Sequence, residues 1–455
     1  VGYLNQKGLL RSEDIGFDRV SFRSNIDAQI TKILRISADL SGRLEFRKEP
    51  GRNMNIILKS IQAARPIIPA HFPDESKATL PGYDADWANP LTISDSEYTG
   101  YNNTDFSSFR GTIGFNLDLG SWIKGLTFNG KFDYRLNHNF TKKFNTPFNY
   151  YDYDIDTDTY KVLSTFNSGK TSLREDYAKD WLWYSLFKLN YNRTFAKRHT
   201  VTGLVLIEAQ SNKHDEFYAY REGFISNAID ELFAGSDENK DNGGSASEGG
   251  RMSYVAKIGY SFKDKYLFDA VARLDGSPKF AKGNRWGFFP AISVAWRINQ
   301  EDFMKENFQN IDNLKLRLSV GQAGDEANVN FNYLTGYQFA NKYIFSSAET
   351  ISKGITTKGL ANPDARWAET TTYNIGIEYS MLNRKIYTEL DIFYRLKSKM
   401  LATRAQSLPS TFGATLPEEN INKQDTRGFE IVLGHANKIG SFIYDIKTNL
   451  SWARS

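Results

Sequence analysis

The sequence has no cysteine, little net charge and no long apolar run. Without cysteine the chain has no disulfide bond, no thiolate nucleophile and no cysteine-based metal site. Its 57 basic and 53 acidic residues are interspersed and leave a net charge of only +4, which is too small to attract nucleic acid. No stretch of about 20 apolar residues occurs, and this excludes a membrane-spanning helix.

Aromatic residues are plentiful instead. The 455 residues include 32 Phe, 25 Tyr and 8 Trp, or 14% aromatics, yet 24% of the chain is charged and its mean hydropathy is −0.51. A disordered chain would be poor in aromatic and β-branched residues. The composition therefore indicates a β-rich protein whose apolar residues alternate with polar ones.

Period-two alternation, the mark of a strand with two unlike faces, is the dominant pattern. From residue 286 to 297, large apolar side chains hold the even positions, and mostly small or polar ones hold the odd positions. The same pattern recurs in residues 128–136, 181–191, 252–262, 266–274, 314–320, 373–381, 385–395 and 442–452. Roughly fourteen such segments of about 10–14 residues are long enough to cross a bilayer as tilted strands.

Aromatic pairs occur ten residues apart on the apolar faces of three of these segments. Ten steps of about 3.3 Å, tilted by about 40°, project to about 25 Å, the height of a lipid-facing band. The pairs therefore predict a girdle at the two membrane interfaces, although aromatics also favour strands in general. The predicted girdle residues are Trp181 with Tyr191, Trp286 with Trp296, and Phe442 with Trp452.

Connection lengths also alternate along the chain. Short connections at residues 195–198, 263–265, 382–384 and 437–440 separate long ones at 45–106, 137–180, 210–249, 324–368 and 399–424. Outer-membrane barrels have short periplasmic turns and long extracellular loops. Residues 299–310 of this chain are expected to form a helical turn on the periplasmic side. We therefore predict an all-β fold, a large antiparallel transmembrane β-barrel of the bacterial outer membrane in contact with its lipid.

Five stretches resemble the barrel of the SusC/RagA-like TonB-linked outer-membrane transporters of Bacteroidota. They are RSNID at residues 23–27, ARLDGSPKFAKGNRWGFFPAISVAWRINQEDFM at 272–304, NLKLRLSVGQAG at 313–324, ANPDARWAETTTYNIGIEYSMLNRKIYTELDIFYRLKSKML at 361–401 and RGFEIVLG at 427–434. The chain departs from the family pattern at Pro278, at Asp325 and Glu326, and in residues 365–369. These departures leave the expected fold unchanged.

The resemblance implies a barrel of about twenty-two strands that encloses an N-terminal plug domain. We expect residues 1–455 to form one partial barrel domain that lacks this plug, with no signal peptide at its start. The implied function is active, TonB-dependent import of a large nutrient, either an oligosaccharide or a peptide, without a cofactor or enzymatic activity. The implied partners are a SusD-like surface lipoprotein over the mouth and the TonB–ExbB–ExbD complex, which acts through the plug.

Two other functions share part of this evidence. A passive porin or an autotransporter-type barrel would show the same alternation and loop asymmetry, but it would lack a plug and the 272–304 motif. A secreted carbohydrate-binding β-protein would not require aromatic pairs at membrane-spanning spacing. No G-x-S-x-G or phosphate-binding loop is present, and the five histidines are scattered without metal-ligand spacing. We therefore identify no catalytic residue.

Two aromatic clusters in the long loops are candidates for substrate contact, because Tyr and Trp offer flat faces with polar tips. The alternative is that these rings pack the loops onto each other or onto a partner. The candidates are Tyr83, Trp87, Tyr98 and Tyr101 in the first cluster, and Phe148, Tyr150, Tyr151 and Tyr153 in the second.

Acidic residues in one loop resemble a calcium-binding loop in spacing. The oxygen-bearing residues are Asp237, Asn239, Asp241 and Glu248. A calcium loop of the EF-hand type needs glycine at its sixth position, where this chain has Asn242. We therefore favour a solvated acidic loop without metal, and the same holds for the similar run Asp152, Asp154, Asp156 and Asp158.

Overall fold

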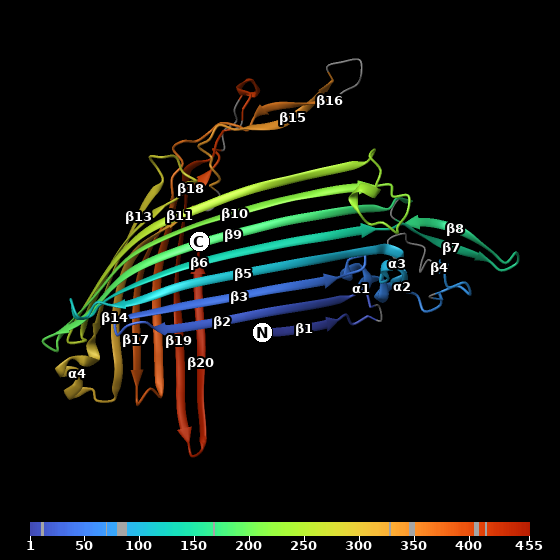
Figure 1. The fold of residues 1–455 in the computed structure, drawn as a ribbon. Helices are drawn as coiled ribbons and strands as arrows, with labels where there is room; N and C mark the ends of the chain where they lie inside the picture. Colours follow the sequence, from blue (N-terminus) through green and yellow to red (C-terminus); the bar gives the residue numbers. More distant parts are fainter. Residues whose placement is uncertain are drawn as a thin grey trace.

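The computed structural model describes residues 1–10, 13–69, 71–79, 89–166, 169–326, 329–344, 351–404, 409–414 and 416–455. These residues form one strongly curved antiparallel sheet of fifteen strands, with smaller structures at its loop end (Figure 1). The strands of this sheet pair in their order along the chain, and the smaller sheets β4–β7–β8 and β15–β16 lie in the connections between them. Among the described strands, β1 and β20 lie at the two edges. The predicted all-β antiparallel architecture is confirmed.

The strands of the large sheet are β1 (Gly2–Lys7), β2 (Gly16–Gln29), β3 (Leu34–Lys48), β5 (Gly100–Asp118), β6 (Leu126–Asn145), β9 (Ser172–Phe195), β10 (His199–Glu222), β11 (Lys240–Phe262), β12 (Tyr266–Gly276), β13 (Trp286–Arg297), β14 (Ile311–Asp325), β17 (Ala368–Met381), β18 (Ile386–Ala402), β19 (Glu419–Ile439) and β20 (Phe442–Arg454). The loops contribute β4 (Ala78–Thr79), β7 (Phe148–Asp154), β8 (Thr159–Phe166), β15 (Tyr337–Ile344) and β16 (Ile351–Thr357). The helices are α1 (Met54–Ala63), α2 (Pro90–Ile93), α3 (Ser96–Thr99) and α4 (Asp302–Asn307), with single 3-10 turns η2 (Leu232–Ala234), η3 (Ile298–Gln300) and η4 (Ser410–Phe412).

Several strands are longer than the sequence pattern predicts. β9 and β10 each have 24 residues and β11 has 23, where segments of about 10–14 residues were expected. The long loops predicted at 137–180 and 210–249 are correspondingly too long, because β6, β9, β10 and β11 extend into them. Backbone pairing continues beyond the bilayer, where both faces meet water and the apolar alternation is no longer required.

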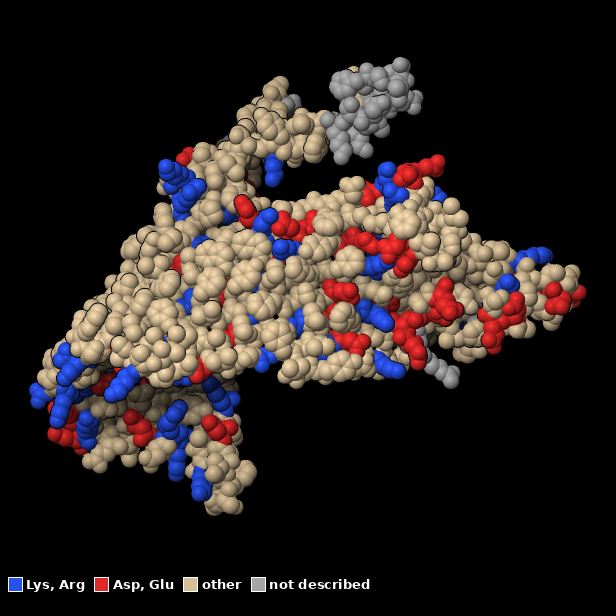
Figure 2. Space-filling model, in the orientation of Figure 1, with Lys and Arg blue, Asp and Glu red and all other residues tan. Residues whose placement is uncertain are grey.

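The register divides the large sheet into two unlike faces. On one face, Ile292 lies between Ala270 and Val320 of the neighbouring strands. On the other, the adjacent Ser293 lies between Asp269 and Ser319. The first face is the apolar outer face, and Figure 2 shows it as a broad band nearly free of charged residues between the charged turn end and the charged loop end. We call the second, polar face the inner wall.

The two ends of the sheet differ as the sequence predicts. Tight turns at residues 196–198, 263–265, 382–385 and 440–441 alternate with much longer connections. Two consecutive residues with positive φ, Lys263 at 50° and Asp264 at 57°, turn the β11–β12 hairpin, as hairpins with the native strand twist require. α4 follows β13 at the turn end, so the helical turn expected at residues 299–310 is confirmed. None of the helices in the described part of the chain has the length and apolar character needed to cross a membrane.

Buried apolar residues gather in two clusters at the loop end. The first contains Ile57, Ala78, Ile93, Phe148 and Tyr150 from the loops around α1, α2 and β7. The second contains Phe280, Phe289, Val329, Ala365 and Trp367. The outer face of the sheet, in contrast, leaves many large apolar side chains exposed, as a lipid-facing surface does.

Candidate functional site

The inner wall carries paired charges along the middle of the sheet. Arg273 on β12 donates from Nε to both carboxylate oxygens of Asp275 at 2.8 Å and from Nη2 to Glu208 Oε1 at 2.8 Å. The Tyr184 hydroxyl donates to the other oxygen of Glu208 at 3.0 Å. Both carboxylates therefore contact the one guanidinium of Arg273, which leaves this group with one negative charge in excess.

A second paired network covers the last strands. Arg317 donates to Asp391 Oδ2 at 2.6 Å, and Lys315 donates to Glu378 Oε1 at 3.1 Å. Nearer the loop end, Lys397 lies 3.0 Å from Asp325. These partly exposed pairs on the three strands β14, β17 and β18 present polar groups to the lumen, and their opposite charges balance each other.

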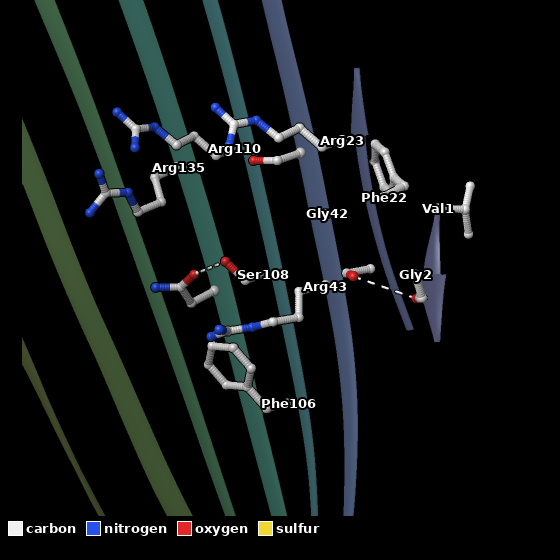
Figure 3. A pocket seen from close by; sticks show the side chains of 13 residues that line it. Val1, Gly2, Phe22, Arg23, Gly42, Arg43, Phe106, Ser108, Arg110 and Arg135 are labelled. Atoms are coloured by element: carbon white, nitrogen blue, oxygen red, sulfur yellow. Dashed lines mark hydrogen bonds between the residues drawn. The ribbon is translucent and has the colours of Figure 1, made fainter. Parts of the chain in front are cut away.

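The first strands differ, because arginines gather there around a hollow in the inner wall. Arg23, Arg43, Arg110 and Arg135 line a cavity of about 600 Å³ together with Ser41, Ser108 and Asn137 (Figure 3). The size is within the range of about 300–1,000 Å³ that is typical of ligand pockets. Alternation along the sequence assigns these residues to the polar face of their strands. That they lie close together depends on the register of the four strands β2, β3, β5 and β6. Sequence reasoning therefore did not single them out, although Arg23 begins the RSNID motif.

The structure buries two of the aromatic residues predicted to contact substrate. Phe148 is 8% exposed and Tyr150 is 3% exposed, and their rings pack edge to face at 5.1 Å. The backbone N–H of Asn89 donates to the Tyr150 hydroxyl at 3.2 Å, and burial raises the pKa of this tyrosine to about 12. Tyr98 packs against Phe148 at 6.3 Å. These three rings hold the loop together, so Phe148 and Tyr150 have no free face for a ligand.

Two other tyrosines of the same loop are more accessible. The Lys77 ammonium lies 4.9 Å above the ring of Tyr151. Tyr153 packs at a tilt against Tyr160 at 4.8 Å, and its hydroxyl donates to Asp158 Oδ1 at 2.8 Å. They occupy the β7–β8 hairpin, which projects from the loop end (Figure 1). Substrate contact by Tyr151 and Tyr153 stays a prediction.

The first predicted aromatic cluster is only partly visible. Tyr83 and Trp87 lie outside the described residues. The Tyr101 hydroxyl donates to Asp230, and burial together with this hydrogen bond raises the pKa of Tyr101. Lys142 of β6 also contacts Asp230, at 3.4 Å. Through these two contacts Asp230 holds the β10–β11 loop against the start of β5 and the end of β6.

The acidic run that resembles a calcium loop does not form a loop of that kind. Asp241 and Glu248 both lie in β11, opposite Tyr220 and Lys213 of β10. Seven residues of extended strand separate the two carboxylates by about 23 Å, so they cannot bind one ion. Asp237 instead pairs with Arg221 at 3.0 Å, and within the described residues no group of three or more His, Asp or Glu side chains could hold a metal.

The structure places the predicted girdle residues on the outer face. Trp296 stacks on Tyr266 at the turn end, where its Nε1 donates to Glu301 at 3.0 Å. Ten residues away, at the loop end of β13, Trp286 packs against Tyr254 at 5.7 Å. Phe442 and Trp452 share the outer face of β20, and Trp181 and Tyr191 share that of β9. An apolar ring with one polar contact suits a membrane interface. That these six residues lie at the two membrane interfaces stays a prediction.

Comparison with known proteins gives consistent relationships. A family model described as TonB dependent receptor-like, beta-barrel, matches residues 71–455. TonB-dependent receptor P26 of Formosa agariphila is 25% identical over 451 residues, which make up 96% of this chain and 41% of that protein. TonB-dependent receptor SusC of Bacteroides thetaiotaomicron is 31% identical over 205 residues, or 44% of this chain and 20% of that protein. The chain thus spans less than half the length of these curated relatives.

Solved structures show the same fold. A chain of the RagAB peptide transporter superposes with a TM-score of 0.75 at 19% identity, and the match covers 99% of this chain and 48% of that one. The RagAB peptide importer in its open-open state gives a TM-score of 0.77 at 18% identity, over 99% of this chain and 47% of the other. The curved sheet therefore corresponds to about half of a longer chain with this fold.

Proposed function

The chain belongs to the family of TonB-dependent receptor β-barrels, which lie in the outer membrane, and on this premise we propose that it forms part of the wall of an active nutrient importer. The observation that carries the proposal is the division of one continuous sheet into an apolar outer face and a polar inner wall. An outer face of this kind fits lipid, and an inner wall of this kind fits a hydrated passage.

The imported nutrient is proposed to be large, an oligosaccharide or a peptide. The peptide alternative is supported by a protein of the same fold that is described as a peptide transporter. In this chain the residues proposed to meet substrate are the polar side chains of the inner wall and the tyrosines Tyr151 and Tyr153 of the β7–β8 hairpin. Their rings offer stacking faces, and the inner wall offers hydrogen-bonding groups.

The proposed partners are a SusD-like surface lipoprotein at the loop end and the TonB–ExbB–ExbD complex at the turn end. The loop end supports the first partnership, because its β15–β16 hairpin stands away from the sheet (Figure 1). Tyr337 of β15 and Ile355 of β16 are largely exposed there, and exposed apolar groups are a feature of surfaces that bind other proteins. The energised step is proposed to act through a plug domain of the intact protein.

Uptake measurements in the native bacterium test this function. Cells would receive a panel of fluorescently labelled oligosaccharides and peptides, with and without the gene for the intact protein and with and without TonB. We expect uptake of at least one probe to fall to background when either gene is deleted. Uptake that needs the barrel gene but persists without TonB would instead establish a passive channel and overturn the proposal.

A further inference from the structure

We propose that the arginine-lined hollow at the start of the sheet binds an anionic polymer, one that carries carboxylate, sulfate or phosphate groups at intervals along its chain. The inference deepens the proposed function and rests on it in one respect, since it takes the inner wall to be the path of the substrate. It is carried by the register of four strands, by an excess of unpaired positive charge and by the hollow that these side chains surround.

Strand register places the arginines in two neighbouring rows across the inner wall. The first row runs Arg23, Ser41, Arg110, Arg135 over β2, β3, β5 and β6. The second row, two residues nearer the loop end, runs Ser21, Arg43, Ser108, Asn137 over the same strands. Because neighbouring strands lie about 4.8 Å apart, Arg110 and Arg135 are direct neighbours and Arg23 lies two strands away.

Two of these arginines have a carboxylate partner, and two do not. Arg110 donates from Nε to Asp133 Oδ2 at 2.7 Å, and Arg43 lies 3.2 Å from Glu45. Among the described residues, Arg23 and Arg135 have no carboxylate within ion-pair distance, and Arg135 interacts with Asp133 only from farther away than Arg110 does. Like charges directly opposite each other on adjacent strands destabilise a sheet, so the Arg110–Arg135 pair carries a cost that a bound anion would remove.

The remaining groups of the hollow suit an extended polyanion. Ser108 donates to Asn137 Oδ1 at 2.8 Å, and both residues continue the second row beyond Arg43. The Arg43 guanidinium rests over the ring of Phe106 at 5.1 Å, a contact that limits its rotamers. Figure 3 shows Arg23, Arg110 and Arg135 reaching to the same side of the strands, whereas Phe22 points away. Guanidinium groups form paired hydrogen bonds with carboxylate, sulfate and phosphate oxygens.

Charge balance along the wall explains why this region, and not another, is proposed. Elsewhere on the wall Arg273, Lys315 and Arg317 each contact a carboxylate, and the inner-wall cations Lys188, Arg395 and Lys447 lie on separate strands. In the two arginine rows there are four arginines and no acidic residue. An anionic chain that enters the lumen would therefore meet several guanidinium groups close together at this hollow.

Binding to the full-length protein in detergent tests the inference. The probes are dextran sulfate oligomers, polygalacturonate oligomers and neutral dextran oligomers of matched length, so that sulfate and carboxylate are distinguished. We expect at least one anionic probe to bind about tenfold or more tightly than neutral dextran, with affinity that falls as salt is added. Equal affinity for charged and neutral probes would overturn the inference.

Substitutions locate the site. The double variant R23Q/R135Q leaves the Arg110–Asp133 pair intact and should lower the affinity for the anionic probe by about tenfold to a hundredfold. The matched control K188Q/K447Q removes two inner-wall charges from β9 and β20 and should lower it by less than about threefold. Unchanged affinity in R23Q/R135Q, with or without a loss of thermal stability, would show that these arginines serve another contact within the intact protein and would overturn the inference.

The same variants separate this inference from the proposed function. TonB-dependent uptake of a probe that is unaffected by R23Q/R135Q, with no preference for anionic probes, would uphold the importer and reject the anion site. Binding of an anionic probe that needs Arg23 and Arg135, in a protein that supports no TonB-dependent uptake, would uphold the anion site and reject the importer.

Discussion

At the residue scale, Glu301 shows how one side chain organises the turn end. Its carboxylate accepts hydrogen bonds from the Tyr266 hydroxyl at 2.7 Å, from Trp296 Nε1 at 3.0 Å and from Lys265 Nζ at 3.1 Å. These donors favour the ionised form and hold the pKa of Glu301 at about 2 instead of its usual value near 4.5. The residue thereby connects the β11–β12 turn to the β13–β14 connection.

A pKa lowered in the folded state makes stability depend on pH in a defined window. The stabilisation is fully present above about pH 4.5 and is lost as the pH falls through about 2, because protonation removes the acceptor charge. We expect the thermal transition of the wild-type protein in detergent to fall across this window, and that of E301Q to fall less. Glu306→Gln, on the exposed side of α4, is the control and should behave like wild type. An identical pH profile for E301Q and wild type would disprove this role.

At the element scale, each strand presents two environments to neighbouring residues. In β13, Ile292 lies on the apolar outer face between Ala270 and Val320. The next residue, Ser293, lies on the inner wall beside Asp269 of the adjacent strand. The alternation continues strand after strand, so the register of each hairpin decides whether a side chain meets lipid or water. A slip of one residue would exchange the two faces completely.

Arginine substitutions at these adjacent positions test the assignment of faces. I292R should destabilise the protein in lipid vesicles by about 2–4 kcal/mol, because it places a charge near the middle of the lipid-facing band. S293R should cost about 1 kcal/mol or less, because its guanidinium faces water and Asp269. The measurement is reversible unfolding in urea with both variants in the same lipid. Equal losses at the two positions would contradict the assignment.

At the scale of the whole molecule, loops that are distant in sequence pack into shared cores. The Trp367 ring packs at a tilt against Phe280 at 5.1 Å and edge to face against Phe289 at 5.7 Å. Its Nε1 donates to the Arg285 carbonyl at 3.0 Å. Val329 completes this cluster from a third segment. The two clusters hold the loops at the loop end together, whereas the sheet itself depends on backbone pairing and on lipid.

Removal of the central ring should therefore free the loops without unfolding the sheet. W367A should cost about 3–5 kcal/mol of packing in this cluster, and we expect faster trypsin cleavage near Lys279 and Lys358. The strands should remain resistant, with fragments identified by mass spectrometry. Trp122→Ala, at a ring that is 83% exposed in the β5–β6 turn, is the matched control and should cleave like wild type. Cleavage throughout the strands of W367A would contradict this division of the molecule.

The sequence by itself determined the class of fold, the two faces of each strand and the alternation of short and long connections, because all three depend on patterns within one strand or between consecutive strands. It also placed the girdle candidates on the outer face and α4 at the turn end. Strand ends beyond the bilayer were missed because pairing there leaves no apolar period. Only the tertiary structure decided which loop aromatics are buried, since Phe148 and Tyr150 pack against Ile57 and Ile93 from other loops. The arginine hollow likewise exists only through the register of β2, β3, β5 and β6, which brings together residues up to 112 positions apart, from Arg23 to Arg135.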